Sequence, residues 1–235
     1  MVLLVLMTIG AGIGGTIWKR DLRVGAIRTE GNKIVPAADI LGSAGIRKGE
    51  KLLGLDLQAA RTRVMSNHFI KDASIEREVP DRIVISITER TPVAAVVAER
   101  MLYLDEDGYV LPPARSEHIF DLPVLTGTLP AGDCVPGKQV KAGNVLDALA
   151  LLATAQRMSD DLYRRISEVH IDGEKDIIFY TSEFGVPVIF GRGASGDKLA
   201  KFEAFWQEFA SRRGPQNLHY VDLRFTDQVV VRWNQ

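Results

Sequence analysis

The sequence predicts an α+β protein with one membrane segment and two folded regions. The first observation is an uncharged apolar run at residues 1–18. The second is a β-α-α-β-β succession of patterns over residues 22–90. The third is a series of short strand patterns interrupted by two helical patterns over residues 91–235, which predicts a mostly antiparallel β domain with two helices.

Residues 1–18 predict a single transmembrane helix. The run has no charge before Lys19 and Arg20, and a helix of this length rises about 27 Å, close to the roughly 30 Å of hydrocarbon in a bilayer. A signal peptide is the alternative, but it would carry basic residues before the run and a small-residue cleavage site. Lys19, Arg20 and Arg23 follow the run, so charge alone favours a cytoplasmic body under the positive-inside rule.

After the apolar run, the chain carries signals for one strand and two helices. A strand pattern over residues 23–30 is followed by a short helix over 36–45, which begins at a proline and ends at a glycine. A second helix is expected over residues 56–68, with the Asp56 side chain placed to cap its first turn.

Two strands complete this region, over residues 73–79 and 82–90. In the second strand, Ile83, Ile85 and Ile87 alternate with smaller or polar residues, which predicts one buried face. The order β-α-α-β-β therefore predicts two helices on one face of a three-stranded sheet.

The region over residues 91–235 combines short strands with two amphipathic helices. One helix is expected over 143–158, and the other begins at Asp197 as its cap and carries an apolar stripe from Leu199 to Phe209. Residues 105–108 form a tight turn that ends in Asp-Gly. The strands are expected over residues 93–98, 101–104, 109–111, 169–172, 176–182, 186–190, 219–225 and 228–233.

Composition argues against several classes of function. The net charge of −1 gives no basic face for nucleic acid. Cys134 is the one cysteine, which excludes an internal disulfide and a cysteine-rich metal site, and the four histidines lack metal-ligand spacing. Asp105-x-Asp107-Gly108 departs from a calcium loop, because Tyr109 and Val110 occupy the next ligand and glycine positions. We therefore expect no metal, no cofactor, no small-molecule substrate and no catalytic residue.

Gly191-Arg-Gly193-Ala-Ser-Gly196 matches a dinucleotide fingerprint, since it follows a strand pattern and opens a helix. The motif lies so near the C-terminus that the remaining parallel strands of a Rossmann sheet have no room. An enzyme that holds a phosphate here is the alternative reading, and a nucleotide-induced rise in melting temperature would favour it.

Behind the apolar run, the first folded region resembles a POTRA module, a βααββ unit that binds other polypeptides in secretion and division proteins. The motifs that carry this resemblance are Gly31-Asn32, Asp56, Val79-Pro80 and Glu89-Arg90. A different POTRA-bearing envelope protein, acting in secretion or outer-membrane assembly, is the alternative. Such a protein would continue into many alternating strands of a membrane barrel, whereas residues 91–235 carry two helical patterns.

The segments that follow resemble the bacterial cell-division family FtsQ/DivIB, a POTRA domain joined to a β domain. The resemblance extends from Val24 to Trp233. Its motifs are Glu89-Arg90-x-Pro92-Val93-Ala94, the segment from Tyr103 to Val110, Leu122-Pro123-Val124-Leu125-x-Gly127, and Tyr220-Val221-Asp222-Leu223-Arg224-Phe225.

The resemblance implies a non-catalytic scaffold of the divisome, the complex that builds the septum. It implies a single-pass protein of the bacterial inner membrane, with its body in the periplasm at the division site. The expected partners are other divisome components, among them the small coiled-coil bitopic proteins FtsB and FtsL. In this family the partner adds a strand beside the terminal strand of the β domain.

The last strand pattern is suited to this binding mode. A terminal strand is readily left at a sheet edge, where its backbone N–H and C=O groups can pair with an incoming segment. Alternation places Val229, Val231 and Trp233 on one face and Val230 and Arg232 on the other. By motif match, Arg224 and Phe225 stand where the family has partner contacts. The alternative is that the valines belong to the core and Trp233 covers the edge of the domain.

Overall fold

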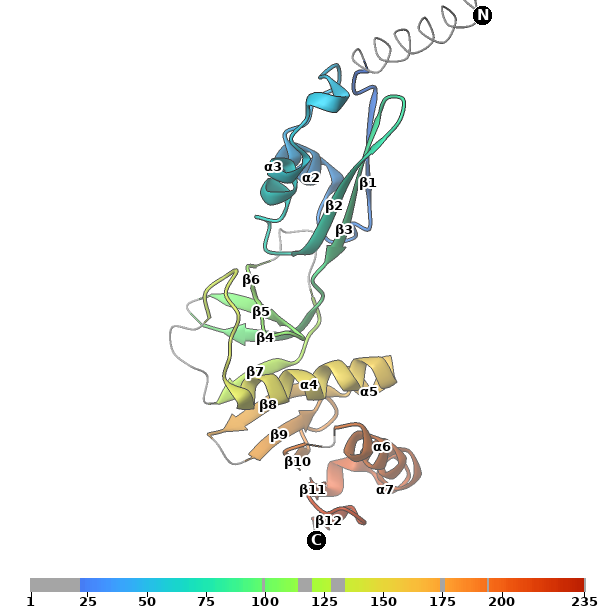
Figure 1. Cartoon of the computed structure of the whole chain (residues 1–235). Helices are drawn as coiled ribbons and strands as arrows, with labels where there is room; N and C mark the ends of the chain where they lie inside the picture. The colour runs from blue at the N-terminus through green and yellow to red at the C-terminus, as the bar shows by residue number, and fades with distance from the viewer. Residues whose placement is uncertain are drawn as a thin grey trace, which may run out of the picture. The chain divides into compact units, whose positions relative to one another are not determined.

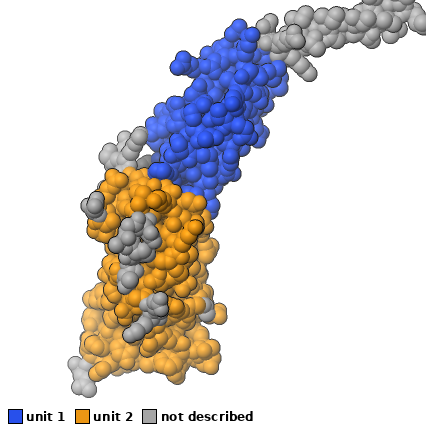
Figure 2. All heavy atoms as spheres, turned by 60° about the vertical axis from the view of Figure 1, so that its left-hand side comes forward, with its two compact units in different colours: residues 1–90 blue, residues 91–235 orange. Residues whose placement is uncertain are grey.

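The computed structural model describes residues 22–98, 100–113, 120–127, 134–173, 176–193 and 195–234. The chain divides into two compact units, Met1–Arg90 and Thr91–Gln235 (Figures 1 and 2). The transmembrane helix expected at residues 1–18 lies outside the described residues. Within the described ranges, no helix is both long enough and apolar enough to cross a bilayer.

The first unit is a three-stranded sheet with two helices, as the β-α-α-β-β pattern predicted. β3 (Arg82–Glu89) is central, parallel to β1 (Ala26–Glu30) and antiparallel to β2 (Ile70–Glu78). α2 (Ala37–Ala44) and α3 (Leu57–Val64) pack together on the same side of this sheet (Figure 1).

Local signals set the ends of these helices. α2 stops because Gly45 adopts a φ of 65° and donates its N–H to the Leu41 carbonyl. The predicted cap of α3 is confirmed, since the Asp56 carboxylate accepts the Ala59 N–H at 2.9 Å. α3 ends at Val64, before the expected residue 68.

Glu89, at the end of β3, holds the segment between β1 and α2. Its carboxylate accepts the backbone N–H groups of Lys33, Ile34 and Val35 at 3.0, 2.8 and 2.8 Å. Three hydrogen bonds to one ionised acceptor fix a loop that has no ladder of its own. The strand ending Glu89-Arg90 therefore has a structural role within the unit.

The second unit is built on a nine-stranded sheet with the order β12-β11-β10-β9-β8-β7-β4-β5-β6. Among the described strands, five of the eight pairings are antiparallel, and β4–β7, β7–β8 and β10–β11 are parallel. The strands are β4 (Pro92–Val97), β5 (Met101–Asp105), β6 (Val110–Leu111), β7 (Val124–Gly127), β8 (Ile166–Asp172), β9 (Asp176–Thr181), β10 (Pro187–Gly191), β11 (Leu218–Asp222) and β12 (Val230–Trp233).

Two long helical segments accompany this sheet (Figure 1). The first is α4 (Gly143–Met158), followed directly by α5 (Asp160–Arg164). The second begins as α6 (Ser195–Phe205), continues as a π turn (Trp206–Ala210) and ends as α7 (Ser211–Arg213). α4, α6 and the strands share one hydrophobic core, in which Phe179 and Phe202 meet edge to face at 5.1 Å.

One expectation for the second helix was wrong. α6 begins at Ser195, so Asp197 lies in the first helical turn and is not the cap. A carboxylate in the first turn still favours the helix, because the N-terminal end carries a partial positive charge.

Candidate partner-binding edge

β12 lies at one edge of the nine-stranded sheet. It pairs antiparallel with β11 through Val230 opposite Asp222, Val231 opposite Val221 and Arg232 opposite Tyr220. Among the residues that the structure describes, no strand pairs with its other side. An edge of this kind offers a row of backbone donors and acceptors to an added strand.

The side chains of the terminal segment divide between two surroundings. Val229, Val231 and Trp233 are half-buried and pack against the hydrophobic core, as alternation predicts. Val230 is also half-buried, and Arg232 is exposed. Val229 precedes the paired residues, since β12 begins at Val230. The segment thus covers the core with one face while its backbone edge stays accessible.

A groove of about 550 Å³ lies between β12 and the helical segment that ends in α7. Phe205 and Phe209 stack in its wall with ring centroids 6.2 Å apart. Across from them, the Arg213 guanidinium lies 4.5 Å from the centroid of the Trp233 ring, a cation–π contact. The lining residues are Phe205, Glu208, Phe209, Arg212, Arg213, Val231 and Trp233.

Sequence reasoning missed the helical half of this groove. The apolar stripe predicts that Phe209 faces the core, yet its side chain is 59% exposed. A π turn spans residues 206–210 and holds one more residue than an α turn, so Ala210 takes the buried place and Phe209 rotates outward. No signal in the sequence marks that turn.

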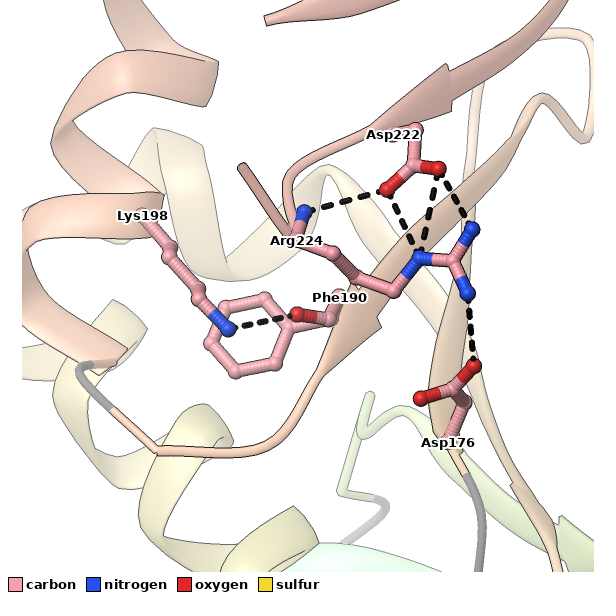
Figure 3. A network of polar contacts seen from close by, with 5 residues as sticks. All are labelled: Asp176, Phe190, Lys198, Asp222 and Arg224. Carbon is pink, nitrogen blue, oxygen red and sulfur yellow. Dashed lines mark hydrogen bonds and ion pairs between the residues drawn. The ribbon is translucent and has the colours of Figure 1, made fainter. Parts of the chain in front are cut away.

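Arg224 follows β11 and is held by two carboxylates of the chain (Figure 3). Its Nη2 lies 2.7 Å from Asp222 Oδ2, and its Nη1 lies 3.1 Å from Asp176 Oδ2. The hydrogen bonds from Arg224 hold the pKa of Asp222 below its ordinary value, against the opposing effect of burial. Phe225, the next residue, is 46% exposed.

Gly191 allows the Arg224 side chain to approach the sheet. Its φ is 71°, and a Cβ at this position would lie 2.9 Å from Arg224 Cγ. From α6, Lys198 Nζ donates to the Phe190 carbonyl at 2.9 Å (Figure 3), and it also donates to the Arg192 carbonyl at 2.7 Å. The carbonyls that flank Gly191 are therefore engaged by the chain's own lysine. β10, which leads into this turn, pairs antiparallel with β9, as expected for a hairpin, and parallel with β11, which follows α6.

The predicted site residues therefore form two groups along the β11–β12 hairpin. Val229, Val230, Val231, Arg232 and Trp233 make up the edge segment beside the groove, and Arg224 and Phe225 lie in the connection from β11. The Asp105 carboxylate accepts the N–H groups of Asp107 and Tyr109 at 3.0 and 2.8 Å, which accounts for that acidic turn structurally. In the described ranges, no three His, Cys, Asp or Glu residues cluster as a metal site.

Comparison with known proteins gives matches over both units. Residues 22–90 match the family model "POTRA domain, FtsQ-type", and residues 95–224 match "Cell division protein FtsQ/DivIB, C-terminal". The second match ends at Arg224, before β12.

Similar proteins cover most of the chain. The cell division protein FtsQ of Anaeromyxobacter sp. is 30% identical over 96% of this chain and 76% of its own. The FtsQ of Geotalea daltonii is 28% identical over 85% of this chain and 72% of its own. The FtsQ of Syntrophotalea carbinolica is 29% identical over 89% of this chain and 73% of its own.

Proposed function

The chain belongs to the FtsQ/DivIB family of cell division proteins, and we propose from this premise that it is a non-catalytic scaffold of the divisome. In this proposal it recruits other division proteins during septum formation and binds small coiled-coil bitopic partners of the FtsB and FtsL kind. Both matching family models are of the FtsQ type, which favours this role over that of other POTRA-bearing envelope proteins.

The observation that carries the proposal is the open edge of β12 beside a groove. Backbone groups on that edge can pair with an extended partner segment, and pairing of this kind is tolerant of sequence. Specificity would come from the groove, where Phe209 offers apolar surface and Arg212 and Arg213 offer positive charge to acidic partner side chains.

Arg224 is proposed as a second contact in this interface. Its guanidinium is already oriented by Asp222 and Asp176, and 46% of its side chain remains accessible. A carbonyl of the partner would meet the remaining N–H groups of a guanidinium whose rotamer is fixed beforehand, which lowers the entropy cost of binding. Phe225, exposed beside it, adds an apolar contact.

The proposal includes a membrane anchor at residues 1–18, with the rest of the chain in the periplasm at the division site of the inner membrane. Its support is the uncharged length of the run and the membership of the family. Lys19, Arg20 and Arg23 lie on the periplasmic side in this arrangement, against the usual charge rule.

The test is capture of FtsB- and FtsL-like proteins from detergent-solubilised membranes by the full chain. Val230→Glu places a charge in the β12 edge, and Trp233→Ala removes one wall of the groove. Val97→Glu is the matched control, because it puts the same charge on an exposed valine of β4, six strands away along the same sheet.

We expect capture by the wild type and by Val97→Glu, and at least a tenfold loss with Val230→Glu, since a buried unpaired charge in an interface costs more than about 1.4 kcal/mol. Circular dichroism spectra must show that each variant folds. Equal capture by all variants would mean that the partner-binding site does not include β12. If the wild type captures neither partner, the scaffold proposal fails.

A further inference from the structure

The first unit has an apolar and basic surface at the end where residue 22 enters it. We name this surface the entry end and define it by residues 22–25, 47–53 and 79–81. β1 and β3 run parallel with Ala26 opposite Arg82, so the β2–β3 turn and the start of β1 lie at the same end of the sheet (Figure 1).

Hydrogen bonds join the three segments of the entry end. The Leu52 N–H donates to the Leu22 carbonyl at 2.8 Å, and the Val24 N–H donates to the Glu50 carbonyl at 3.0 Å. The Gly25 N–H donates to the Asp81 carbonyl at 2.7 Å. The segments therefore form one ordered surface that needs no rearrangement to meet a ligand.

Two large apolar side chains project from this surface. Leu53 is 55% exposed and Val79 is 61% exposed, and they are the exposed large hydrophobic residues among the described residues of the first unit. Both lie at loop tips, Leu53 in a short 3₁₀ turn and Val79 between β2 and β3. Their gathering at one end of the unit indicates a surface that is covered in the working protein.

The charges around these two side chains are mainly positive. Arg23, Arg47, Lys48 and Lys51 are all exposed, whereas the acidic residues of the entry end are Glu50, which is half-buried, and Asp81, which is exposed. The next ion pair along the strands, Arg82 with Glu78 at 2.9 Å, is neutral as a whole. Exposed apolar side chains at the same end of the unit as exposed lysine and arginine residues fit an anionic lipid surface.

The covalent connection brings a bilayer within reach. This step rests on the anchor proposed above for residues 1–18. Three residues separate Trp18 from Leu22, and the four Cα–Cα steps between them span at most about 14 Å in an extended chain. The headgroup layer of one leaflet is roughly 5–7 Å thick. The anchor would thus keep Leu53, held next to Leu22 through Leu52, close to the lipid headgroups.

We propose that the entry end is a lipid-binding surface, which seats the first unit on anionic headgroups of the membrane that anchors the chain. Leu53 and Val79 enter the interfacial layer, while Lys48 and Lys51 contact lipid phosphates. Seating restricts how the first unit turns on its short tether, and so limits the directions from which division proteins reach it.

The test uses the full chain in vesicles of phosphatidylethanolamine and phosphatidylglycerol. In a Cys134→Ser background, an environment-sensitive fluorophore is attached to Leu53→Cys, to Val79→Cys or to Lys33→Cys. Position 33 is the control, because it is exposed and follows the far end of β1, roughly 15 Å along the sheet. Quenching by lipids that carry a nitroxide at the headgroup reports contact with the bilayer.

We expect quenching at positions 53 and 79 and none at 33. Lys48→Gln and Lys51→Gln should each lower the ratio of seated to free unit about fivefold, since one basic residue near an anionic membrane surface strengthens binding by about this factor. Raising salt from 0.1 M to 1 M should act in the same direction, because the Debye length falls from about 10 Å to about 3 Å.

Flotation of the same samples separates the two proposals. Chains that float with the vesicles but show equal quenching at 53 and 33 would overturn the lipid-binding surface and leave the anchor standing. Chains that do not float would overturn both. Shielding of position 53 that appears only after a division protein is added would assign the surface to a protein partner and overturn the lipid assignment.

Discussion

Strands β3 and β12 show how the same kind of pattern leads to different roles. In β3, Ile83, Ile85 and Ile87 alternate and are at most 6% exposed, because a strand lies on each side and helices cover one face of the sheet. In β12, Val231 and Trp233 alternate in the same way but stay half-buried, because β11 pairs on one side only. Apolar alternation identifies a strand with a buried face, and its neighbours decide whether it also offers an edge.

The largest expected effect contrasts the two strands directly. Ile85→Ala should lower the free energy of unfolding by about 2–5 kcal/mol, because it leaves a cavity in a fully buried site. Val231→Ala should cost no more than about 1.5 kcal/mol, since its side chain is already partly exposed. Urea denaturation of both variants measures the difference. Equal losses would contradict the contrast between a central strand and an edge strand.

The sequence predictions were accurate where neighbouring residues determine the structure, and they were incomplete where distant segments pair. Turns and caps predicted from neighbouring residues were confirmed at Gly45, Asp56 and the Asp-Gly turn at residue 108, whereas the cap expected at Asp197 was wrong. The parallel pairings β1–β3 and β7–β8 could not be predicted, because each joins segments that are far apart in sequence with no tight turn between them.

One half of the candidate site, the terminal strand, was predicted from the sequence, and the helical half was not. The terminal strand could be recognised from its own alternation, so Val231 and Trp233 were placed correctly on one face. The other wall of the groove depends on a π turn that rotates Phe209 out of the core, and a regular helical period cannot show such a turn.

Gly191 and Gly193 offer a second contrast, between a glycine in contact with the β11 connection and a glycine in open space. Both have positive φ, 71° and 66°, but a Cβ would contact Arg224 only at Gly191. Gly193→Ala should therefore cost about 1 kcal/mol for backbone strain alone, and Gly191→Ala about 2–3 kcal/mol. Thermal or urea unfolding measures both. Equal costs would mean that Arg224 moves aside freely.

Asp222 links stability to pH more strongly than the exposed Asp72 of the first unit. Hydrogen bonds from Arg224 lower the pKa of Asp222, so the folded protein binds this proton less readily than the unfolded chain does. The stabilisation is present above the unfolded pKa of about 3.9 and is lost as pH falls through that value toward the lower folded pKa. Asp222→Asn should cost about 1–2 kcal/mol at pH 7, and its stability should fall less steeply with acidification.

Asp72→Asn is the matched control for this pH dependence. The pKa of Asp72 is also lowered, chiefly by its hydrogen bond to Arg61, but the pair is exposed on the surface and screened by solvent. Urea denaturation between pH 3 and pH 7 should show the wild-type slope retained in Asp72→Asn and reduced in Asp222→Asn. A slope reduced in Asp72→Asn and retained in Asp222→Asn would mean that the pH dependence of stability arises in the first unit.

The smallest expected change in stability separates two edges of the molecule. Arg232→Ala alters an exposed residue of β12, and Arg28→Ala alters an exposed residue of β1, the edge of the three-stranded sheet. Each should change the free energy of unfolding by no more than about 0.5 kcal/mol. If β12 is the partner-binding edge, capture of the FtsB- and FtsL-like proteins should fall for Arg232→Ala and stay unchanged for Arg28→Ala. Loss with Arg28→Ala alone would assign recruitment to the first unit, because the two substitutions remove the same charge from exposed positions on two edge strands.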